Sequence, residues 1–592
     1  MYDGDCAICC YWVAYWRELT QGRVDYRPYQ EAAKDFPEIP LEAFQRAIQM
    51  IESGRVYSGA AATFRVLRHS RGRAAWWWCY SRVPGFAALS EWTYAFLARR
   101  RGFLDRVTKL LWGPELHAER YALVSWIFLR LFGAIYVAAF ASLGVQILGL
   151  VGHDGILPLA DYLAAAHRAY GDSAYWKLPS LFWLNSSDFA LLAGTVVGAV
   201  LGLLVVADRW TRPALIALFA LYLSYVHAGQ EFMSFQWDSL LLETGFLSIF
   251  LTGGSKILVW LFRWLVFRYL FLAGIVKLLS GDPTWRDLTA LDYHFWTQPL
   301  PTPLARYAAQ LPHALLTGGT AATLIIEVGS VFLIFMPRRL RAVAACCVLP
   351  LQLLIMLTGN YNFFNLLTML LCVFLFDDAA LRRLIPGRLV LTAQRRAPSA
   401  SRTATVIAAV LALIVVPMGV DRVWQTFTRH DLVGVLTRAV APFFIVNPYG
   451  LFAVMTTTRP EIIIEGSSDG RVWREYVFRY KPGPLNRPAK WNIPHQPRLD
   501  WQMWFAALGS VRDSPWIISL MERLLEGSPP VLGLLDSNPF TGSPPKFVRA
   551  WLYHYRFADS RARALTGQRW IRGDARLYFP KVSLADFERR TD

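Results

Sequence analysis

The sequence has few charged residues for its length. Asp, Glu, Lys and Arg make up 18% of the 592 residues, hydrophobic residues make up 55%, and the mean hydropathy is +0.30. Soluble globular proteins carry about 25% charged residues, so this chain has too little polar surface to cover itself in water. The composition excludes a soluble globular protein and predicts a membrane protein with soluble domains at its ends.

Cysteine is also scarce, and none follows Cys372. The region after about residue 424 therefore cannot form a disulfide-stapled domain. A cleavable signal peptide is not expected either, because residues 1–5 are acidic and no apolar segment separates them from Cys6. We therefore expect the amino-terminal domain to stay in the cytoplasm. The cysteines are Cys6, Cys9, Cys10, Cys79, Cys346, Cys347 and Cys372.

Acidic residues are outnumbered by basic ones. The chain has 61 Lys and Arg against 43 Asp and Glu, a formal net charge of +18. Such an excess can indicate nucleic-acid binding, but here the basic residues lie mainly between apolar runs, as in the cytoplasmic loops of membrane proteins. The expected partner is therefore the lipid bilayer, and no nucleic acid is expected.

Nine apolar runs are long enough to consider as membrane spans. Three of them, 213–229, 237–253 and 362–376, are short, and re-entrant or broken helices there would reduce the number of crossings to seven or eight. Nine crossings is the predicted number. The runs lie near residues 122–150, 188–207, 213–229, 237–253, 256–279, 314–336, 340–358, 362–376 and 403–423.

The basic residues predict the orientation of these spans. Lys and Arg near span ends stay on the cytoplasmic side, and the segments before the first run and around Arg338 and Arg382 are rich in them. With nine spans the amino terminus is cytoplasmic and the carboxyl terminus is external, whereas an even number places both inside. We expect a bacterial inner membrane location, or the endoplasmic reticulum membrane in a eukaryote.

Residues 1–110 are predicted to form a small α/β domain with a strand at 24–26 and a hairpin of 48–51 and 55–58. Its motif at residues 2–10, YDGDCAICC, places Cys6 and Cys9 on one turn at a helix amino terminus. The helix dipole there favours a reactive thiolate, and a dithiol can exchange with disulfides. Alternatively, Cys6 and Cys9 are an inert remnant of a fused domain, or they form half of a metal site, although no second ligand pair is spaced for zinc.

This motif and the later Gly-Ala-Ala-Ala run at 59–62 resemble the thiol-disulfide oxidoreductase DCC family. The resemblance implies a thioredoxin-like fold with Cys6 and Cys9 as the catalytic pair. The sequence departs from the pattern in two ways: no strand precedes the motif, and no proline stands directly before Ile48. No cofactor and no metal are expected.

Ionisable residues within the apolar runs are candidate functional residues, because burying them in lipid is costly. We expect opposite charges on neighbouring helices to pair, with Asp238 or Glu243 next to Lys277 and Glu327 next to Arg268. Such pairs could fix helix register only, or they could line a polar functional cavity.

The connection at 280–312 combines charges, aromatic residues and turn residues, and it is too long for a simple hairpin. Asp282, Arg286 and Asp287 are its candidate functional residues. Its tryptophan and tyrosine rings could equally be interface anchors.

From about residue 440 the apolar runs stop, and short alternating runs predict an antiparallel β-rich domain over 440–592. Trp501, Trp504 and Arg498 are candidate contacts for a client protein, and core packing or membrane anchoring is the alternative for the tryptophans.

Several strings between about residues 120 and 580 are long enough to be specific. They include SFQWDSLLLETGFL (234–247), KLLSGDPTWRDLTALDYHFWTQPLP (277–301), GNYNFFNLLTML (359–370), NPYGLFAVM (447–455) and PHQPRLDWQMWFAAL (494–508). These strings resemble the lipase maturation factor family. The resemblance covers about residues 120–580 and implies a multi-pass membrane protein, whose animal members help secreted lipases to reach their active dimeric form in the endoplasmic reticulum. It predicts a membrane bundle over 120–425 and a maturation function for exported clients such as lipases.

Two other functions remain open from the sequence. The bundle with its loop at 152–158 loosely resembles the core of vitamin K-dependent carboxylases, and in that case Lys277 or Glu243 would act as a base. Alternatively, the chain is a membrane-tethered thiol oxidoreductase that acts on cytoplasmic partners.

Overall fold

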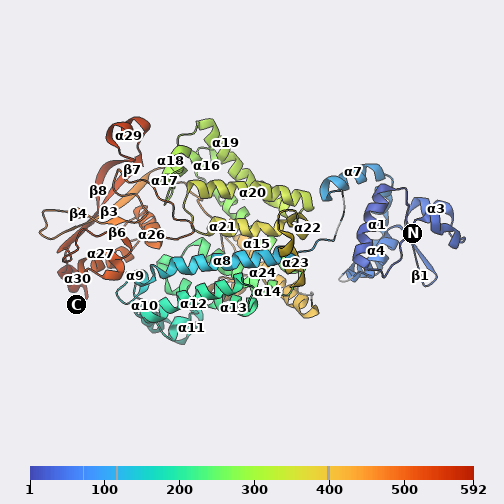
Figure 1. The fold of residues 1–592 in the computed structure, drawn as a ribbon, viewed down its shortest axis with the longest axis horizontal. Coiled ribbons are helices and arrows are strands. Elements are labelled where there is room, and N and C mark those ends of the chain that lie inside the picture. Colours follow the sequence, from blue (N-terminus) through green and yellow to red (C-terminus); the bar gives the residue numbers. More distant parts are fainter. Residues whose placement is uncertain (71–72, 115, 117, 397–400, 592) are drawn as a thin grey trace. The chain divides into compact units, whose positions relative to one another are not determined.

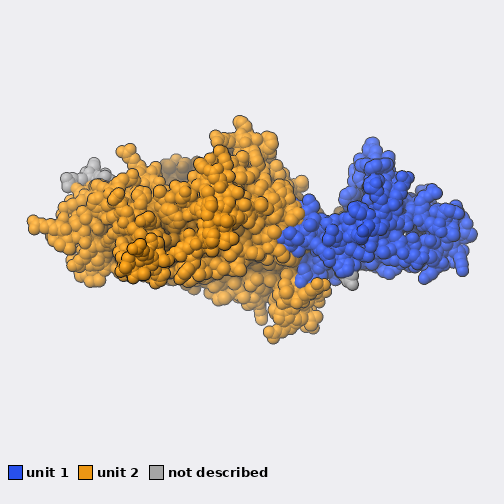
Figure 2. Space-filling view, turned by 90° about the horizontal axis from the view of Figure 1, so that it is seen from above, with its two compact units in different colours: residues 1–120, 335–343, 377–380 blue, residues 121–334, 344–376, 381–592 orange. Residues whose placement is uncertain are grey.

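The computed structural model describes residues 1–70, 73–114, 116, 118–396 and 401–591. The chain divides into two compact units, which Figure 2 colours separately. Unit 1 comprises residues 1–120, 335–343 and 377–380, and unit 2 comprises residues 121–334, 344–376 and 381–592. The carboxy-terminal domain and most of the helical bundle therefore belong to one unit.

Unit 1 contains a two-stranded hairpin surrounded by helices (Figure 1). The hairpin confirms the prediction, with Gln49 opposite Ser58 and a turn at Ser53 and Gly54, both of which have positive φ. Its elements are α1 (Ala7–Thr20), α2 (Tyr29–Ala32), η1 (Ala33–Asp35), α3 (Leu41–Arg46), β1 (Gln49–Glu52), β2 (Arg55–Ser58), α4 (Gly59–Arg68), α5 (Ala74–Arg82), α6 (Phe86–Ala98) and α7 (Arg101–Trp112).

The strand expected at 24–26 is wrong. An isolated parallel bridge lies next to this segment, between Tyr2 and Pro28. Pro28 has no N–H group to extend a ladder, and helix α2 begins directly after it. A thioredoxin-like fold for this unit stays a prediction.

All nine apolar runs form helices. Six helices in the described residues are long and apolar enough to cross a membrane, and α13, α14 and α21, which fall on the three short runs, are not among them. The chain is thus a multi-pass α-helical membrane protein, and the count of nine crossings stays a prediction. The helices are α8 (Ala122–Gly144), α12 (Asp188–Val206), α13 (Thr211–Ala228), α14 (Gln236–Leu251), α15 (Lys256–Leu279), α19 with η5 and η6 (His313–Phe335), α20 (Arg338–Thr358), α21 with η7 (Phe364–Leu375) and α24 (Arg402–Thr428).

Helix α15 is the centre of the bundle, and it packs against α14, α21 and α24. Most of its residues are buried, including the charged side chains Arg263, Arg268 and Lys277. Helices α8 and α12 approach each other closely where Gly133 faces Gly202, because a Cβ atom at Gly133 would lie 2.8 Å from the Gly202 carbonyl oxygen. Small residues of this kind allow close packing of helices in lipid.

The carboxy-terminal region contains the expected antiparallel sheet. Its strand order is β4-β3-β7-β8, and Ile463 of β3 lies opposite Trp551 of β7. The first of the short alternating runs, residues 451–455, forms turns instead of a strand, and Phe452 within it has a positive φ. The elements are β3 (Arg459–Ser467), β4 (Arg474–Glu475), β5 (Val477–Phe478), α26 (Arg498–Ala507), α27 (Trp516–Glu526), α28 (Pro529–Leu532), β6 (Leu535–Ser537), β7 (Phe547–Phe557), α29 (Ser560–Thr566), β8 (Trp570–Val582) and α30 (Leu584–Thr591).

Short helices fill the connections of unit 2. The 280–312 connection contains α16 to α18, and Trp285 within it is buried and donates from Nε1 to the Phe452 carbonyl over 3.0 Å. This connection is therefore part of the core. The short helices of unit 2 are α9 (Ile147–Val151), α10 (Leu159–Tyr170), η2 (Gly171–Ser173), α11 (Ala174–Lys177), η3 (Leu181–Trp183), η4 (Gln230–Met233), α16 (Pro283–Arg286), α17 (Ala290–Thr297), α18 (Ala305–Ala308), α23 (Gly387–Arg395), α25 (Gly434–Val440) and η8 (Ala441–Phe443). A further short helix, α22 (Asp378–Leu381), belongs mostly to unit 1.

Candidate functional site

The dithiol lies at the start of helix α1. Cys6 is the N-cap residue and Cys9 is in the first turn, so the two Sγ atoms are 2.7 Å apart, with the Cys9 thiol donating. The preceding loop is held by Gln30, which donates to the Asp3 carboxylate over 2.8 Å and accepts from the Gly4 amide over 3.1 Å. The local geometry therefore brings the predicted pair together.

The environment of Cys9 differs from that expected at a helix amino terminus. Burial, together with the hydrogen bond to Cys6, raises the pKa of the Cys9 thiol. Cys9 therefore stays a protonated thiol at neutral pH. In a dithiol exchange it has the character of a resolving group rather than of the attacking thiolate.

Cys9 lines a largely apolar cavity of about 380 Å³, here named the Cys9 chamber. Its walls come from α1, α4, α6 and α7 and from the residues before β1. The carboxylate of Glu91 in α6 positions one wall, because it accepts hydrogen bonds from the Ala60 and Ala61 amides at the start of α4. The lining residues are Asp3, Ile8, Cys9, Trp12, Tyr15, Trp16, Phe44, Ala47, Ile48, Thr63, Leu67, Arg73, Tyr94, Leu97, Ala98, Arg101, Leu104 and Thr108.

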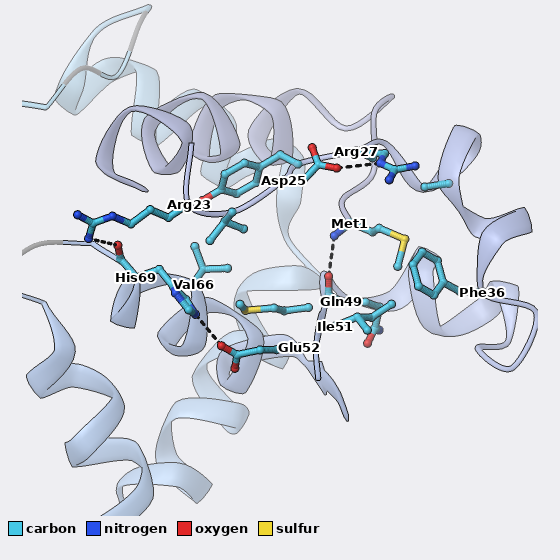
Figure 3. A pocket seen from close by; sticks show the side chains of 14 residues that line it. Met1, Arg23, Asp25, Arg27, Phe36, Gln49, Ile51, Glu52, Val66 and His69 are labelled. Atoms are coloured by element: carbon cyan, nitrogen blue, oxygen red, sulfur yellow. Dashed lines mark hydrogen bonds and ion pairs between the residues drawn. The ribbon is translucent and has the colours of Figure 1, made fainter. Parts of the chain in front are cut away.

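A second hollow of unit 1, of about 330 Å³, has a different character (Figure 3). Charged side chains surround it, including Glu52, which pairs with His69 over 2.9 Å, and Arg27, which pairs with Asp25 over 2.9 Å. Neither Cys6 nor Cys9 is among its lining residues. It therefore has no direct connection with the dithiol.

In unit 2, Asp238 of α14 forms a buried bidentate ion pair with Arg498, the first residue of α26. Arg498 Nη2 lies 2.8 Å from Asp238 Oδ1, and Nη1 lies 2.9 Å from Oδ2. The Tyr222 hydroxyl donates to Oδ1 over 2.5 Å, and Nη1 also donates to the Phe232 carbonyl over 2.8 Å. The pair fastens the carboxy-terminal domain to the bundle.

Glu243 lies one and a half turns further along α14 and is fully buried. It pairs with Arg268 of α15. Its Oε2 also accepts hydrogen bonds from the Asn447 amide over 3.0 Å and from the Tyr449 hydroxyl over 2.9 Å. The segment that follows η8 therefore caps this buried charge of the bundle.

Lys277 pairs with Glu327, with its Nζ 2.5 Å from Oε2, and it also donates to the Ala273 carbonyl over 2.9 Å. Glu327 lies in the π-helical turn Ile325–Gly329, which interrupts the helix formed by 313–335. Such single turns accommodate a side chain that a regular helix would place elsewhere. The Lys277 ammonium also lies 5.3 Å from the centre of the Trp285 ring.

The pairings predicted from the sequence are wrong, although every residue in them is in a buried ion pair. Glu243 and Glu327 exchange their expected partners, and Asp238 pairs with a residue outside the bundle. The prediction considered only neighbouring helices, whereas the nearest cation to Asp238 comes from the carboxy-terminal domain.

The loop residues have local roles. Asp282 caps α16 through the Thr284 amide over 2.8 Å, and its other oxygen accepts from the Met455 amide over 2.5 Å. Arg286 and Asp287 are exposed. Of these three residues, only Asp282 contributes to the joint between the loop and the carboxy-terminal domain.

Trp501, Trp504 and Arg498 are buried, with 3%, 6% and 2% of their surfaces exposed. Trp504 Nε1 donates to the Thr297 carbonyl over 2.8 Å, and Trp501 packs against Trp237 with ring centres 4.8 Å apart. A client cannot reach these side chains in this structure, so the expectation that they contact clients is corrected. They join the two parts of unit 2.

Sequence reasoning missed three further joint residues. Asn447 and Tyr449 lie in the NPYG string, but nothing in the surrounding sequence indicated that they donate hydrogen bonds to a buried carboxylate. Arg459 pairs with Glu461 over 2.8 Å and donates to the carbonyl groups of Trp296, Gln298 and Pro299. An arginine and a glutamate two residues apart, directly before three isoleucines, were the available signal.

A cleft of about 560 Å³, here named the Tyr162 cleft, opens in unit 2 beside this joint. Residues from α10, α13, η4 and α27 line it. It presents both apolar rings and the exposed polar groups Glu231 and Ser234. Its lining residues are Leu157, Tyr162, Val226, His227, Gln230, Glu231, Met233, Ser234, Ser239, Phe444, Pro515 and Trp516.

Comparison with known proteins covers almost the whole chain. Residues 123–383 match the lipase maturation factor transmembrane domain, residues 445–580 match the lipase maturation factor C-terminal domain, and residues 1–107 match a DCC1-like thiol-disulfide oxidoreductase. No solved structure matches the chain.

Curated relatives agree with these matches. Lipase maturation factor 2 of Homo sapiens is 36% identical over 590 residues, which covers 78% of this chain and 82% of the human protein. Lipase maturation factor 1 of Bos taurus is 34% identical over 515 residues, covering 80% of this chain and 91% of the bovine protein. The chain is an integral membrane protein that belongs to the lipase maturation factor family and carries a thiol-disulfide oxidoreductase-like domain at its amino terminus.

Proposed function

We propose that the protein is a membrane-embedded maturation factor that holds exported proteins, most notably secreted lipases, while they fold. The curated relatives carry the name lipase maturation factor. The observation that carries the proposal is the buried joint of unit 2. Arg498 neutralises Asp238, and Asn447 and Tyr449 donate hydrogen bonds to Glu243. Because all three donors follow the bundle in the chain, the carboxy-terminal domain is a fixed platform on the membrane helices.

The Tyr162 cleft is the client-contact surface in this proposal. It is open, it lies beside the joint, and its mixture of rings and polar groups suits an extended segment of a folding protein. It replaces the buried tryptophans as the place where a client binds.

The test fills the cleft without disturbing the joint. Ser234 is exposed, and its hydroxyl donates to the carbonyl three residues earlier, so Ser234→Trp adds a ring at the cleft wall at little cost to the fold. Ser173 makes the same local hydrogen bond and does not line the cleft, so Ser173→Trp is the matched control. Secreted lipase activity should fall with Ser234→Trp and stay unchanged with Ser173→Trp, and equal activities would refute this role of the cleft.

The proposed orientation places the amino terminus in the cytoplasm and the platform outside, in a bacterial inner membrane or in the endoplasmic reticulum membrane of a eukaryote. The distribution of basic residues supports it. Reporters fused to each terminus test it, and reporters on the same side would contradict it.

The dithiol geometry favours a second activity, thiol-disulfide exchange with partners on the amino-terminal side of the membrane. The Sγ atoms of Cys6 and Cys9 are close enough to form a disulfide with a small movement. A Cys9→Ser variant removes the resolving thiol, so it should accumulate mixed disulfides through Cys6. No trapped species above the level of a Cys6→Ser control would count against this activity.

A further inference from the structure

The walls of the Cys9 chamber are suited to a flat ring. Trp12, Trp16, Phe44 and Tyr94 contribute aromatic rings to the lining, and the volume of about 380 Å³ is at the small end of the range for ligand sites. Aromatic faces bind planar rings by stacking. A single substituted ring therefore fits better than a peptide, whose backbone needs many polar partners.

The few polar groups of the chamber include two guanidinium groups. Arg73 donates to the Tyr15 hydroxyl over 2.9 Å. Arg101 lies 3.5 Å from the Asp3 carboxylate and donates from Nη2 to the Gln45 and Arg46 carbonyls. Each guanidinium carries five N–H donors, more than these contacts use among the described residues. These donors are suited to neutral carbonyl oxygens on the edge of a ring.

Helix α6 separates the chamber from an exposed apolar surface. Tyr94, Leu97 and Ala98 face the chamber, whereas Leu89 and Trp92 on the same helix are 61% and 65% exposed. A helix that is apolar on all sides is usually buried in protein or lipid. Arg99 and Arg100 at its end are suited to lipid phosphates, and the first membrane helix begins at Ala122, so a short stretch of chain joins this unit to a membrane span.

We propose that the Cys9 chamber binds a lipid-soluble quinone, which accepts the electrons of the Cys6–Cys9 dithiol. The redox group, the aromatic walls, the guanidinium donors and the apolar outer face of α6 meet at this one place. The inference deepens the proposed thiol-disulfide activity and rests on it, because it names the oxidant of that dithiol.

The reaction is balanced. Both S–H bonds break and one S–S bond forms between Cys6 and Cys9, which releases two electrons and two protons. The quinone takes up both electrons and both protons, so its two carbonyl groups become the hydroxyl groups of a hydroquinone. Neither metal nor a further co-reactant is required.

The test uses the full-length, reduced protein in phosphatidylcholine nanodiscs. The probe is a fully substituted benzoquinone with a decyl chain, whose ring carbons cannot add a thiol. Ala98→Phe places a ring in the chamber, and Ala95→Phe is the control on the same helix, because Ala95 is exposed and does not line the chamber. Peptide mass spectrometry measures the Cys6–Cys9 disulfide, and absorbance measures hydroquinone. Diamide, a water-soluble thiol oxidant, reports whether the dithiol is competent in each variant.

The quinone should oxidise the unmodified protein and the Ala95→Phe variant at equal rates, with one hydroquinone formed per disulfide. The Ala98→Phe variant should react at least about tenfold more slowly, the change for about 1.4 kcal/mol of lost binding, while diamide oxidises all three alike. Equal quinone rates in both variants would overturn the inference, as would oxidation by diamide without oxidation by quinone. If diamide also fails to form the disulfide in the unmodified protein, the thiol-exchange activity itself is refuted.

A second measurement does not depend on the reaction. In a Cys6→Ser/Cys9→Ser variant, bound quinone should quench tryptophan fluorescence, because Trp12 and Trp16 line the chamber. Adding Ala98→Phe should reduce that quenching and adding Ala95→Phe should not. Identical quenching curves would overturn the chamber as the binding site.

Discussion

Removing the Arg498 side-chain charge should release the carboxy-terminal domain from the bundle. Arg498→Met keeps much of the length and apolar volume of the side chain but leaves the Asp238 carboxylate buried, with the Tyr222 hydroxyl as its remaining donor among the hydrogen bonds described above. Both partners of the ion pair are almost fully buried, with exposed side-chain fractions of 2% and 0%. The lost interaction is therefore not replaced by water.

Breaking a buried pair by removing one partner costs about 3–5 kcal/mol. Because 1.4 kcal/mol is a factor of ten, the population with the domain undocked should rise roughly one hundredfold to several thousandfold. Replacing both partners, as in Asp238→Asn/Arg498→Met, should recover most of the loss, since no uncompensated charge then remains. The exposed pair of Arg438 and Asp431 is the control, and Arg438→Met should cost less than about 1 kcal/mol.

Hydrogen exchange measured by mass spectrometry on the protein in nanodiscs is the suitable assay, because it reports local opening without assuming two-state unfolding. The peptide over 494–508 contains the Gln496 and Arg498 amides, which donate to Ser142 Oγ over 2.8 Å and to Gln146 Oε1 over 2.9 Å. Exchange of this peptide should accelerate in Arg498→Met and largely recover in the double variant. Protection that is unchanged in Arg498→Met, or a double variant as open as the single one, would refute the claim that this ion pair holds the joint.

Three further outcomes are expected. Glu243→Gln should lower the free energy of local opening over 444–452 by about 2–4 kcal/mol, because the carboxylate accepts several charge-assisted hydrogen bonds. Hydrogen exchange there should accelerate, and unchanged exchange would contradict the capping role. Burial, with the nearby Arg498 charge, lowers the pKa of His495 from 6.5 to about 4. The stability contributed by neutral His495 is thus complete above about pH 6.5 and is lost as the pH falls towards 4. His495→Asn should remove this acid sensitivity of the joint. A pH profile of exchange that is the same in the variant would exclude His495 as its cause. Lys277→Met should lower the amount of folded protein in detergent, and Lys277→Met/Glu327→Gln should restore both folding and lipase maturation; restored folding without maturation would instead favour a base at Lys277.

The sequence was sufficient for features that depend on short-range patterns. The apolar runs became helices, and the three runs noted as short are the three helices that fall outside the six strongest candidates. The hairpin at 48–58 followed from alternation and a Ser-Gly turn. The position of Cys6 and Cys9 on one helical turn followed from their spacing alone.

Partner choice in the buried core could not be predicted in this way. The Asp238 carboxylate and the Arg498 guanidinium are 260 residues apart in the chain, and no periodicity relates them. The prediction for Trp501 and Trp504 was wrong for a related reason, since the same residue type occurs at an internal joint and on a binding surface. Only the packing of the whole unit distinguishes the two cases.

The long separation between Asp238 and Arg498 also constrains biosynthesis. At about 5–20 residues per second, the ribosome needs roughly 13–52 s to make the 260 residues between the acid and its cation. Arg268 follows Glu243 by only 25 residues, so that neighbour is neutralised almost at once. Helix α14 is therefore made long before its partner, and Asp238 lacks this cation until Arg498 has been synthesised.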